Sequence, residues 1–182
     1  MEVSEEPAAA TFEELAMPLF DQLYNFAHWL TQNRSETEDL VQETYVKALK
    51  GFSSFQPHTN FRAWIYRILR NTFLTSRTGL RATSTVALDD EEESLEIPAS
   101  GGTPESIFID HAQEQLLQSA IERLPLNFRE ILLLCDVEEM SYKEISEALS
   151  VPIGTVMSRL SRARKALREI LQQDLRHGQV RG

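Results

Sequence analysis

One segment divides the chain in two, because its composition is unsuited to any regular element. LDDEEESLEIPASGGTPES, at residues 88–106, combines a dense run of carboxylates with prolines and glycines. Such a stretch buries too little apolar surface to fold, and Pro and Gly interrupt helices and strands. A chain of 182 residues can bury one moderate core or two small ones, so we expect two domains joined by this linker. The expected parts are a disordered N-terminus at residues 1–11, a first domain at 12–80, an acidic linker at 81–105, a second domain at 106–175 and a tail at 176–182.

Both domains are predicted to be helical, because apolar residues recur at spacings of three and four and the alternation typical of strands is absent. Three stretches of the form S/T-x-x-E, at residues 11–14, 35–38 and 141–144, have the pattern of a capping box. In that motif the hydroxyl accepts from a backbone N–H of the first turn, and the glutamate reaches back to the cap residue. We expect a helix to begin at each. The predicted fold class is all-α, with two small helical domains and a flexible acidic linker.

A helix expected at residues 60–77 is the main basic element of the first domain. Its apolar stripe is predicted to be Phe61, Trp64, Ile65, Ile68, Leu69 and Phe73. Trp64 has the same helical spacing as the other residues of this stripe, so we expect its side chain to belong to the core and not to stack on a base. Residues 44–88 contain no Asp or Glu, although the formal net charge of the chain is −10. A basic stretch free of carboxylates favours contact with nucleic acid. Its cations are Lys47, Lys50, Arg62, Arg67, Arg70, Arg77 and Arg81.

The second domain contains a helix-turn-helix pattern at residues 141–171. A short helix is expected to bury Ile145, Ala148 and Leu149, a tight turn follows at residues 151–154, and a second helix begins after it. The apolar face of that second helix is Val156, Leu160, Ala163, Leu167 and Leu171. Its opposite face suits the DNA major groove, where arginine can bind guanine O6 and N7 and short hydroxyls reach base edges or phosphates. That face presents Thr155, Ser158, Arg159, Ser161, Arg162 and Lys165.

Composition also limits the location and the chemistry of the protein. No run approaches the roughly 18 apolar residues of a membrane span, and the acidic start MEVSEEPAAATFEE is unlike a signal peptide. We therefore expect a cytoplasmic protein without membrane contact. The single cysteine, Cys135, lies in the apolar run ILLLCDV and is expected to be a small core side chain. The four histidines are scattered without the spacing of metal ligands, so we expect no metal and no other cofactor.

Two other classes of protein could contain a helix-turn-helix or a basic domain. A response regulator would place a receiver domain with strands before its DNA-binding domain, and the first half of the chain has no strand pattern. An enzyme acting on nucleic acid would need a metal-binding carboxylate cluster, but the basic region lacks carboxylates and those of DDEEE lie in the linker. We expect a protein that is not an enzyme and has no small-molecule substrate. A stand-alone helix-turn-helix regulator of transcription remains the alternative.

Three segments in the same order resemble the extracytoplasmic-function sigma factors of bacterial RNA polymerase. ETEDLVQETYVKALKGFSSF is similar to region 2.2 of that family, NFRAWIYRILRNTFLTSR to regions 2.3 and 2.4, and residues 124–167 to region 4. The resemblance covers nearly the whole chain. It implies an alternative sigma factor that binds core RNA polymerase and directs promoter-specific transcription initiation, in a stress response and under anti-sigma control. DLVQETYVKAL, FRAWIYRILRNTF and PIGTVMSRL are most similar to the redox-responsive subgroup that zinc-containing anti-sigma factors hold inactive.

The resemblance also implies roles for individual residues. The helix with Asp39, Gln42 and Glu43 is similar to the one that docks on the clamp helices of the polymerase β′ subunit, and an acidic and amide face suits a basic partner. The loop at residues 53–60 resembles one that captures a base flipped from the non-template strand. The basic helix after it resembles the part that recognises and melts the −10 element. The residues implied in −10 recognition are Phe55, His58, Asn60, Arg67, Arg70 and Asn71.

The second domain would recognise the −35 element through the helix at residues 155–165. Met157 and Ser161 depart from the basic or bulky residues of many relatives, which leaves the −35 bases open. The implied partners are core RNA polymerase, through its β′ clamp helices and its β subunit, promoter DNA and an anti-sigma factor. The acidic linker resembles the segment that passes through polymerase channels, where its charge suits a basic wall. Redox sensing would belong to the anti-sigma factor and not to Cys135.

Overall fold

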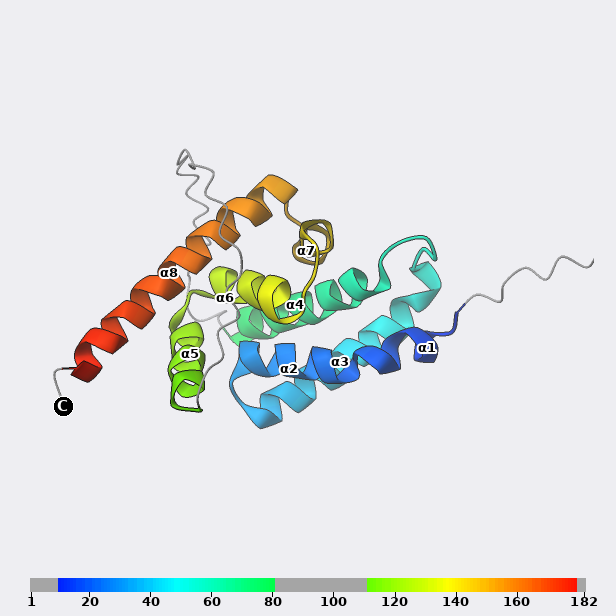
Figure 1. Cartoon of the computed structure of the whole chain (residues 1–182). Coiled ribbons are helices and arrows are strands. Elements are labelled where there is room, and N and C mark those ends of the chain that lie inside the picture. The colour runs from blue at the N-terminus through cyan, green and yellow to red at the C-terminus, as the bar shows by residue number, and fades with distance from the viewer. Residues whose placement is uncertain (1–9, 81–110, 180–182) are drawn as a thin grey trace, which may run out of the picture.

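The computed structural model of the chain describes residues 10–80 and 111–179, and within these ranges it contains helices and turns but no strand (Figure 1). The first domain consists of α1 (Phe12–Ala16), the 3-10 turn η1 (Met17–Leu19), α2 (Phe20–Thr31), α3 (Arg34–Gly51), the 3-10 turn η2 (Phe52–Ser54) and α4 (Phe61–Leu80). The second consists of α5 (His111–Arg123), α6 (Leu126–Leu132), the π-helical turn η3 (Leu133–Val137), α7 (Tyr142–Leu149) and α8 (Ile153–Gln179). The predicted all-α fold with two helical domains is confirmed. The expected linker at 81–105 and most of the expected N-terminal segment lie outside the described residues.

Two of the three predicted capping boxes are present. At the start of α1 the Thr11 hydroxyl accepts from the Glu14 amide, and the Glu14 carboxylate accepts from the Thr11 amide at 2.9 Å. Ser141 and Glu144 make the same reciprocal pair at the start of α7, with 2.8 Å between the Ser141 nitrogen and the carboxylate. Each box satisfies two backbone donors that the first helical turn leaves without a partner.

The capping box predicted at residues 35–38 is wrong. Gln32 is the C-cap of α2, and its left-handed φ of 54° turns the chain. Asn33 then caps α3, because its side-chain oxygen accepts from the Glu36 amide at 3.1 Å. Asparagine is as good an N-cap as serine, so the helix begins two residues earlier than the serine would allow. The expected partner of the serine, Glu38, instead accepts from Arg34 Nε at 2.9 Å.

The core of the first domain lies among α2, α3 and α4. Its buried side chains include Leu23, Phe26, Leu30, Leu40, Val41, Ile65, Tyr66 and Leu69. The stripe predicted for α4 is largely confirmed, because Phe61, Ile65, Leu69 and Phe73 are buried; Trp64 and Ile68 are partly buried against the core. The sequence pattern did not indicate that Tyr66 would be among the most deeply buried side chains of α4.

In the second domain α7 and α8 form the predicted helix-turn-helix. Ile145, Ala148 and Leu149 of α7 are buried, which confirms its apolar face. Of the apolar face predicted for α8, Val156, Leu160 and Ala163 are buried, whereas Leu167 and Leu171 are half-buried. The turn between them begins at Ser150, whose φ of 57° ends α7 in the left-handed region. The Ser146 hydroxyl closes the turn by donating to the Val151 carbonyl at 2.5 Å. Among the described helices, none combines the length and the apolar character needed to cross a membrane.

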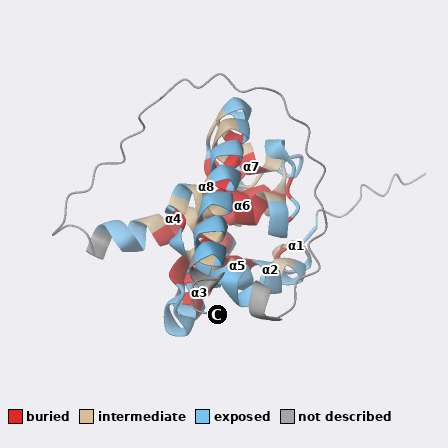
Figure 2. Ribbon diagram, turned by 60° about the vertical axis from the view of Figure 1, so that its left-hand side comes forward, coloured by how far each residue is buried: buried red, intermediate tan, exposed pale blue. Residues whose placement is uncertain are grey.

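The two domains pack against each other. Helix α4 of the first domain packs against α7 of the second, and Figure 1 shows α6 beside α4. The buried apolar side chains of both domains form one connected cluster. In Figure 2 the buried residues of α6 and α7 lie toward the middle of the molecule, whereas the outward side of α8 is mostly exposed. The basic helix of the first domain is therefore partly covered by the second.

Candidate nucleic-acid interface

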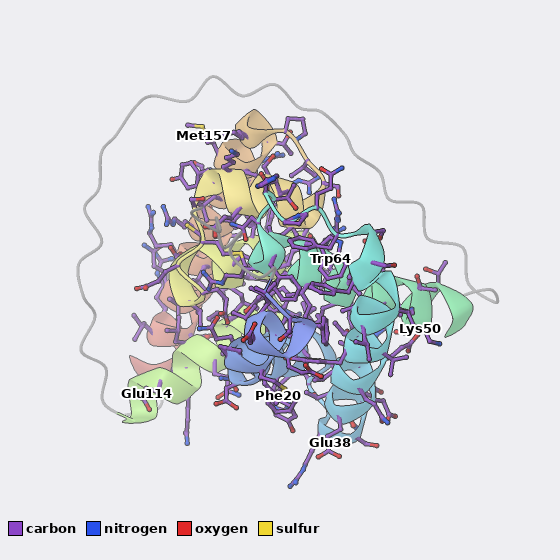
Figure 3. All side chains as sticks on the ribbon, turned by 90° about the vertical axis from the view of Figure 1, so that its right-hand side faces the viewer. Phe20, Glu38, Lys50, Trp64, Glu114 and Met157 are labelled. Carbon is purple, nitrogen blue, oxygen red and sulfur yellow. The ribbon has the colours of Figure 1, made fainter. Side chains whose placement is uncertain are left out.

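A cavity of about 820 Å³ lies between the loop before α4 and the start of α7. The structure places several of the residues predicted for −10 recognition in its wall, namely Phe55, His58, Asn60 and Arg67. Trp64 also lines the cavity, and Figure 3 shows it near the boundary of the two domains. Two predicted residues, Arg70 and Asn71, lie further along α4 and are not part of this wall. The second domain completes the cavity with Ser141, Lys143, Glu144 and Glu147.

Aromatic rings fix the shape of the loop wall. The Phe55 ring stacks on Phe52 with 5.9 Å between centroids, and it meets the Phe61 ring edge-on at 5.3 Å. Its centroid is 5.1 Å from that of Trp64. Such offset and edge-to-face pairs are more favourable than burial of the same area alone. Trp64 therefore packs against the core, as expected, while it also lines the cavity.

Asn60 connects the loop to both domains. Its side-chain oxygen accepts from the Ala63 amide at 3.0 Å and so caps α4, and its side-chain nitrogen donates to the Glu144 carboxylate at 2.8 Å. Burial disfavours ionisation of Glu144, but its hydrogen bonds with Ser141 and Asn60 outweigh burial and leave its pKa below the ordinary value. Both the nitrogen and the oxygen of the Asn60 side chain thus make a hydrogen bond, whereas His58 is exposed.

The cations of α4 differ in their surroundings. Arg67 and its neighbour Asn71 are exposed, as a DNA-binding role requires. Arg70 faces α6, where its Nε and Nη2 donate to the two carboxylate oxygens of Glu130 at 2.8 and 3.0 Å. Glu130 is 1% exposed, so this bidentate ion pair is buried on its acidic side. In this arrangement Arg70 is bound by the second domain and is only partly exposed to solvent.

The face of α8 predicted for −35 recognition lies opposite its buried residues. Ser161, Arg162 and Lys165 are exposed, and the residues nearer the turn, Thr155, Ser158 and Arg159, are half-buried. Met157 is 53% exposed and lies at the outer end of the domain (Figure 3). The structure therefore brings the whole predicted set onto one helix surface.

Arg164 is a cation of α8 that does not belong to this surface. Its Nη2 donates to Asp136 at 2.6 Å and lies 3.8 Å from the Cys135 sulfur. The expectation that Cys135 is a core side chain holds in part, because it is half-buried against the core. Burial raises the pKa of its thiol, which keeps the sulfur protonated at neutral pH.

The predicted docking face of α3 is open to solvent. Asp39, Gln42 and Glu43 are all exposed. The same face continues with two exposed apolar side chains, Val46 at 45% and Leu49 at 58%. The sequence pattern did not indicate these two, although Val46 is three residues from Glu43 and Leu49 is seven residues from Gln42, spacings that place them on one side of a helix. The face thus combines acidic groups with an apolar surface that a partner could cover.

Comparison with known proteins gives the family of the chain. Residues 15–83 match the family model "Sigma-70 region 2", and residues 114–167 match "Sigma-70, region 4". The chain is 36% identical over 185 residues to the ECF RNA polymerase sigma factor SigE of Mycolicibacterium smegmatis, across 94% of this chain and 70% of that protein. The chain belongs to the extracytoplasmic-function sigma factors. This sigma factor is therefore a transcription initiation factor, and the alternative of a stand-alone regulator is set aside.

Further similar proteins support the assignment of the chain to this family. The ECF RNA polymerase sigma factor SigW of Bacillus subtilis is 32% identical over 159 residues, which cover 84% of each chain. Among solved structures, the sigma factor RpoE of Bartonella quintana, in complex with the anti-sigma factor NepR, matches with a TM-score of 0.68 at 28% identity, over 88% of this chain and 96% of that one. CnrH, in complex with the cytosolic domain of CnrY, shares the fold, with a TM-score of 0.61 at 21% identity.

Proposed function

We propose that this sigma factor uses three separate surfaces for core polymerase, the −10 element and the −35 element. The observation that best supports this assignment is the division of α8 into a buried and an exposed side. Val156, Leu160 and Ala163 anchor the helix in the core, while Arg162 and Lys165 project from the opposite side. A helix held in this way can enter the major groove without losing its packing. Its hydroxyl and guanidinium groups then meet base edges and phosphates.

The loop before α4 and the cavity beside it are proposed to bind the melted −10 strand. An unstacked base offers a π-face and free hydrogen-bonding edges, and the cavity wall contains aromatic rings, among them Phe55 and Trp64. His58 is exposed on the loop and can donate or accept a hydrogen bond. Arg67 lies on the cavity wall and is exposed, so its guanidinium can hold a phosphate next to the captured base.

The α3 face is proposed to dock on the β′ clamp helices of core polymerase. Asp39 and Glu43 supply charge that would attract a basic surface, and exposed Val46 and Leu49 supply apolar area that such a contact would bury. The second domain is proposed to contact the β subunit as it holds the −35 element. Neither partner requires a cofactor or a catalytic group in this chain.

An anti-sigma factor is proposed to control this sigma factor in the cytoplasm. Two relatives of the same fold, RpoE of Bartonella quintana and CnrH, were solved in complex with NepR and with the cytosolic domain of CnrY. We assign the chain to the redox-responsive subgroup with a zinc-containing anti-sigma factor, on the likeness of its region 2 and region 4 motifs. Oxidant should then release the sigma factor from its partner even in a Cys135→Ser variant, because the thiol is kept protonated and unreactive by burial.

The test is a transcription assay with purified bacterial core RNA polymerase on a promoter library, run with and without core. We expect transcripts that depend on both proteins and that start at a small promoter set with shared −35 and −10 sequences. Binding of the chain alone to the same duplexes should be weak, because its net charge is −10 and each domain is small. Selective duplex binding without core, together with no effect on core, would contradict the proposal.

A further inference from the structure

Met157 is a large apolar side chain on the exposed surface of α8. It lies one turn into the helix and is 53% exposed, whereas Met140 of the same domain is 3% exposed in the core. Burial of apolar surface favours association, so a methionine held in water offers area that a ligand can cover. Met157 is therefore a candidate contact residue, and its place on the helix decides for what.

The surface around Met157 is not covered by the described parts of the chain. Ile153, one turn earlier on the same side of α8, is 46% exposed. At Gly154, the next residue, an added Cβ atom would meet no heavy atom within 4 Å. Figure 3 shows Met157 at the outer end of the second domain. The first turns of α8 therefore present an open apolar pair, Ile153 and Met157.

Met157 stands where the second helix of a helix-turn-helix meets base edges, because the N-terminal residues of that helix enter the major groove. It lies one turn before Ser161, so it borders the polar face that is proposed for the −35 element. The hydroxyl of the adjacent Ser158 donates to the Thr155 carbonyl at 3.2 Å, so its proton is used within the helix. An apolar contact at Met157 would therefore add to the polar contacts of this face.

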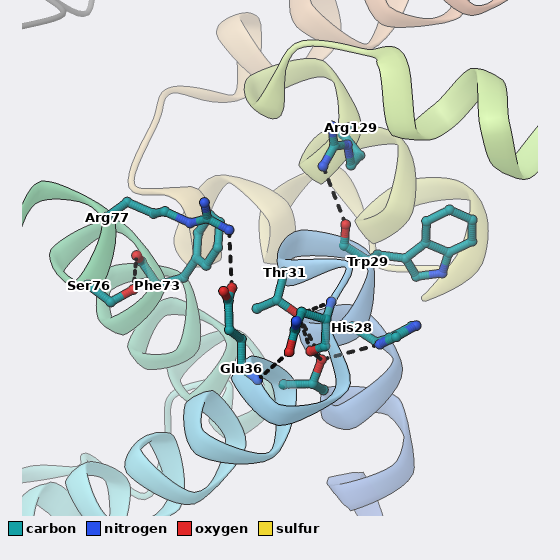
Figure 4. Close-up of polar contacts among 10 residues, drawn as sticks. His28, Trp29, Thr31, Glu36, Phe73, Ser76, Arg77 and Arg129 are labelled. Atoms are coloured by element: carbon teal, nitrogen blue, oxygen red, sulfur yellow. Dashed lines mark hydrogen bonds and ion pairs between the residues drawn. The ribbon is translucent and has the colours of Figure 1, made fainter. Parts of the chain in front are cut away.

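The charges beside this surface divide it into a side for phosphates and a side for bases. Arg164, two turns further along the apolar side of the face, is paired with Asp136 at 2.6 Å. Arg77 at the end of α4 is paired with Glu36 in the same manner, at 3.4 Å (Figure 4). Arg162 instead donates to a backbone carbonyl of its own helix at 3.4 Å, which leaves its charge for a phosphate. The apolar side is thus the one suited to a base edge.

We propose that Met157 reads a thymine of the −35 element by packing its side chain against the C5-methyl group. This rests on the proposed role of α8 in −35 recognition. The methyl group is the apolar feature that distinguishes thymine in the major groove, and cytosine lacks it. An unbranched, polarisable methionine chain adapts its shape to such a small apolar group. The contact therefore favours thymine over cytosine without a hydrogen bond.

The test uses the full chain assembled with core polymerase, because the chain alone should bind duplex DNA weakly. The probe is a fluorescein-labelled promoter duplex that contains the −35 sequence selected from the promoter library by the wild-type protein with core. Each thymine of the −35 element, on either strand, is replaced in turn by uracil, which lacks only the methyl group. Competition measured by fluorescence anisotropy gives the relative affinities of the thymine and uracil duplexes.

At one position uracil should weaken binding of the wild type about fourfold, which is the contribution of one buried methyl-sized group. Met157→Ala should bind the thymine and uracil duplexes of that position equally and should keep any response to uracil elsewhere. Leu175→Ala is the matched control, because Leu175 is also an exposed apolar side chain of α8, at 59%, but lies near the other end of the helix. This control should keep the fourfold preference.

A second series of duplexes isolates the methyl group on a different base. At the same position, thymine is replaced by cytosine or by 5-methylcytosine, each opposite guanine. The wild type should bind the methylated duplex about fourfold more tightly than the unmethylated one, whereas Met157→Ala should not distinguish them.

Three results would overturn the proposal, and they differ in what they say of α8. An equal affinity of the wild type for thymine and uracil at every position, or the same preference in Met157→Ala, would overturn it and leave −35 recognition by α8 intact. Loss of core binding by Met157→Ala would assign the side chain to a contact with polymerase instead. Selection of no −35 sequence by the wild type with core would remove the proposed role of α8 as well.

Discussion

Replacing Tyr66 by phenylalanine removes one hydroxyl from the contact between the domains and leaves the ring in place. The ring is 1% exposed and packs with its centroid 5.3 Å from that of Phe26, so the packing is kept. The hydroxyl donates to Glu138 at 2.8 Å, and a hydrogen bond to a charged group contributes about 1.5–3 kcal/mol to stability. Glu138 retains Arg62 at 3.6 Å, so we expect a loss of about 1.5–2 kcal/mol at pH 7.

The loss should depend on pH because it concerns the ionised carboxylate. Burial raises the pKa of Glu138, and the hydrogen bond from Tyr66 together with the charge of Arg62 partly opposes this. An acid whose pKa is raised by folding contributes stability that is fully present below its unfolded pKa and is lost as pH rises through the folded pKa. Without the hydroxyl the folded pKa rises further. The two proteins should therefore differ most at pH 7, and the difference should shrink toward pH 4 as the carboxyl becomes protonated in both.

Urea unfolding of the full chain at pH 7, 5.5 and 4, followed by circular dichroism, measures this difference. Tyr45→Phe is the control, because the Tyr45 hydroxyl donates to the uncharged Ala16 carbonyl at 2.8 Å. Its loss should cost about 0.5–1.5 kcal/mol at every pH in this range. The reasoning is refuted if Tyr66→Phe is equally destabilising at pH 4 and pH 7, or if its pH dependence matches that of the control.

Three further predictions concern the proposed DNA-binding face of α8, the proposed docking face of α3 and the start of α3. Arg162→Ala should weaken −35 recognition by about 1–3 kcal/mol and relax base preference, measured on the promoter library; an equal loss on every sequence would instead indicate a phosphate contact. Combined Asp39→Lys and Glu43→Lys changes should abolish association with core polymerase in a pull-down while circular dichroism stays unchanged, since both residues are exposed; unaltered association would exclude them from the docking site. Asn33→Ala should destabilise the protein to urea by about 1 kcal/mol and Ser35→Ala by much less, and the reverse order would restore the serine as the cap of α3.

The helical fold could be predicted from the sequence because its signals are local. Apolar spacing identified the buried side of α4 and of the helix-turn-helix, and two capping boxes marked the starts of α1 and α7. The third failed where two competent cap residues, Asn33 and Ser35, stand close together. A pattern of residue types does not distinguish between them, because the choice depends on the left-handed turn at Gln32 that ends the preceding helix.

The contact between the domains could not be predicted in the same way. Arg70 and Glu130 are 60 residues apart, and Tyr66 and Glu138 are 72 apart, with the acidic segment between them. Glu130 stands in an apolar run, which could have indicated a buried carboxylate, but nothing in the sequence names its partner. The motifs therefore place the proposed DNA-binding residues on their helices without showing that the second domain covers some of them.

Glu144 lies at the start of two helices that belong to different domains. One of its carboxylate oxygens accepts from the Ser141 amide at the first turn of α7, and the other accepts from Asn60, which caps α4. Each helix start has a partial positive charge from the aligned peptide dipoles, so one carboxylate compensates two macrodipoles. Separating the two domains would leave Glu144 with α7 and would remove this counter-charge from the start of α4. That end of α4 would then be more attractive to a nucleotide phosphate.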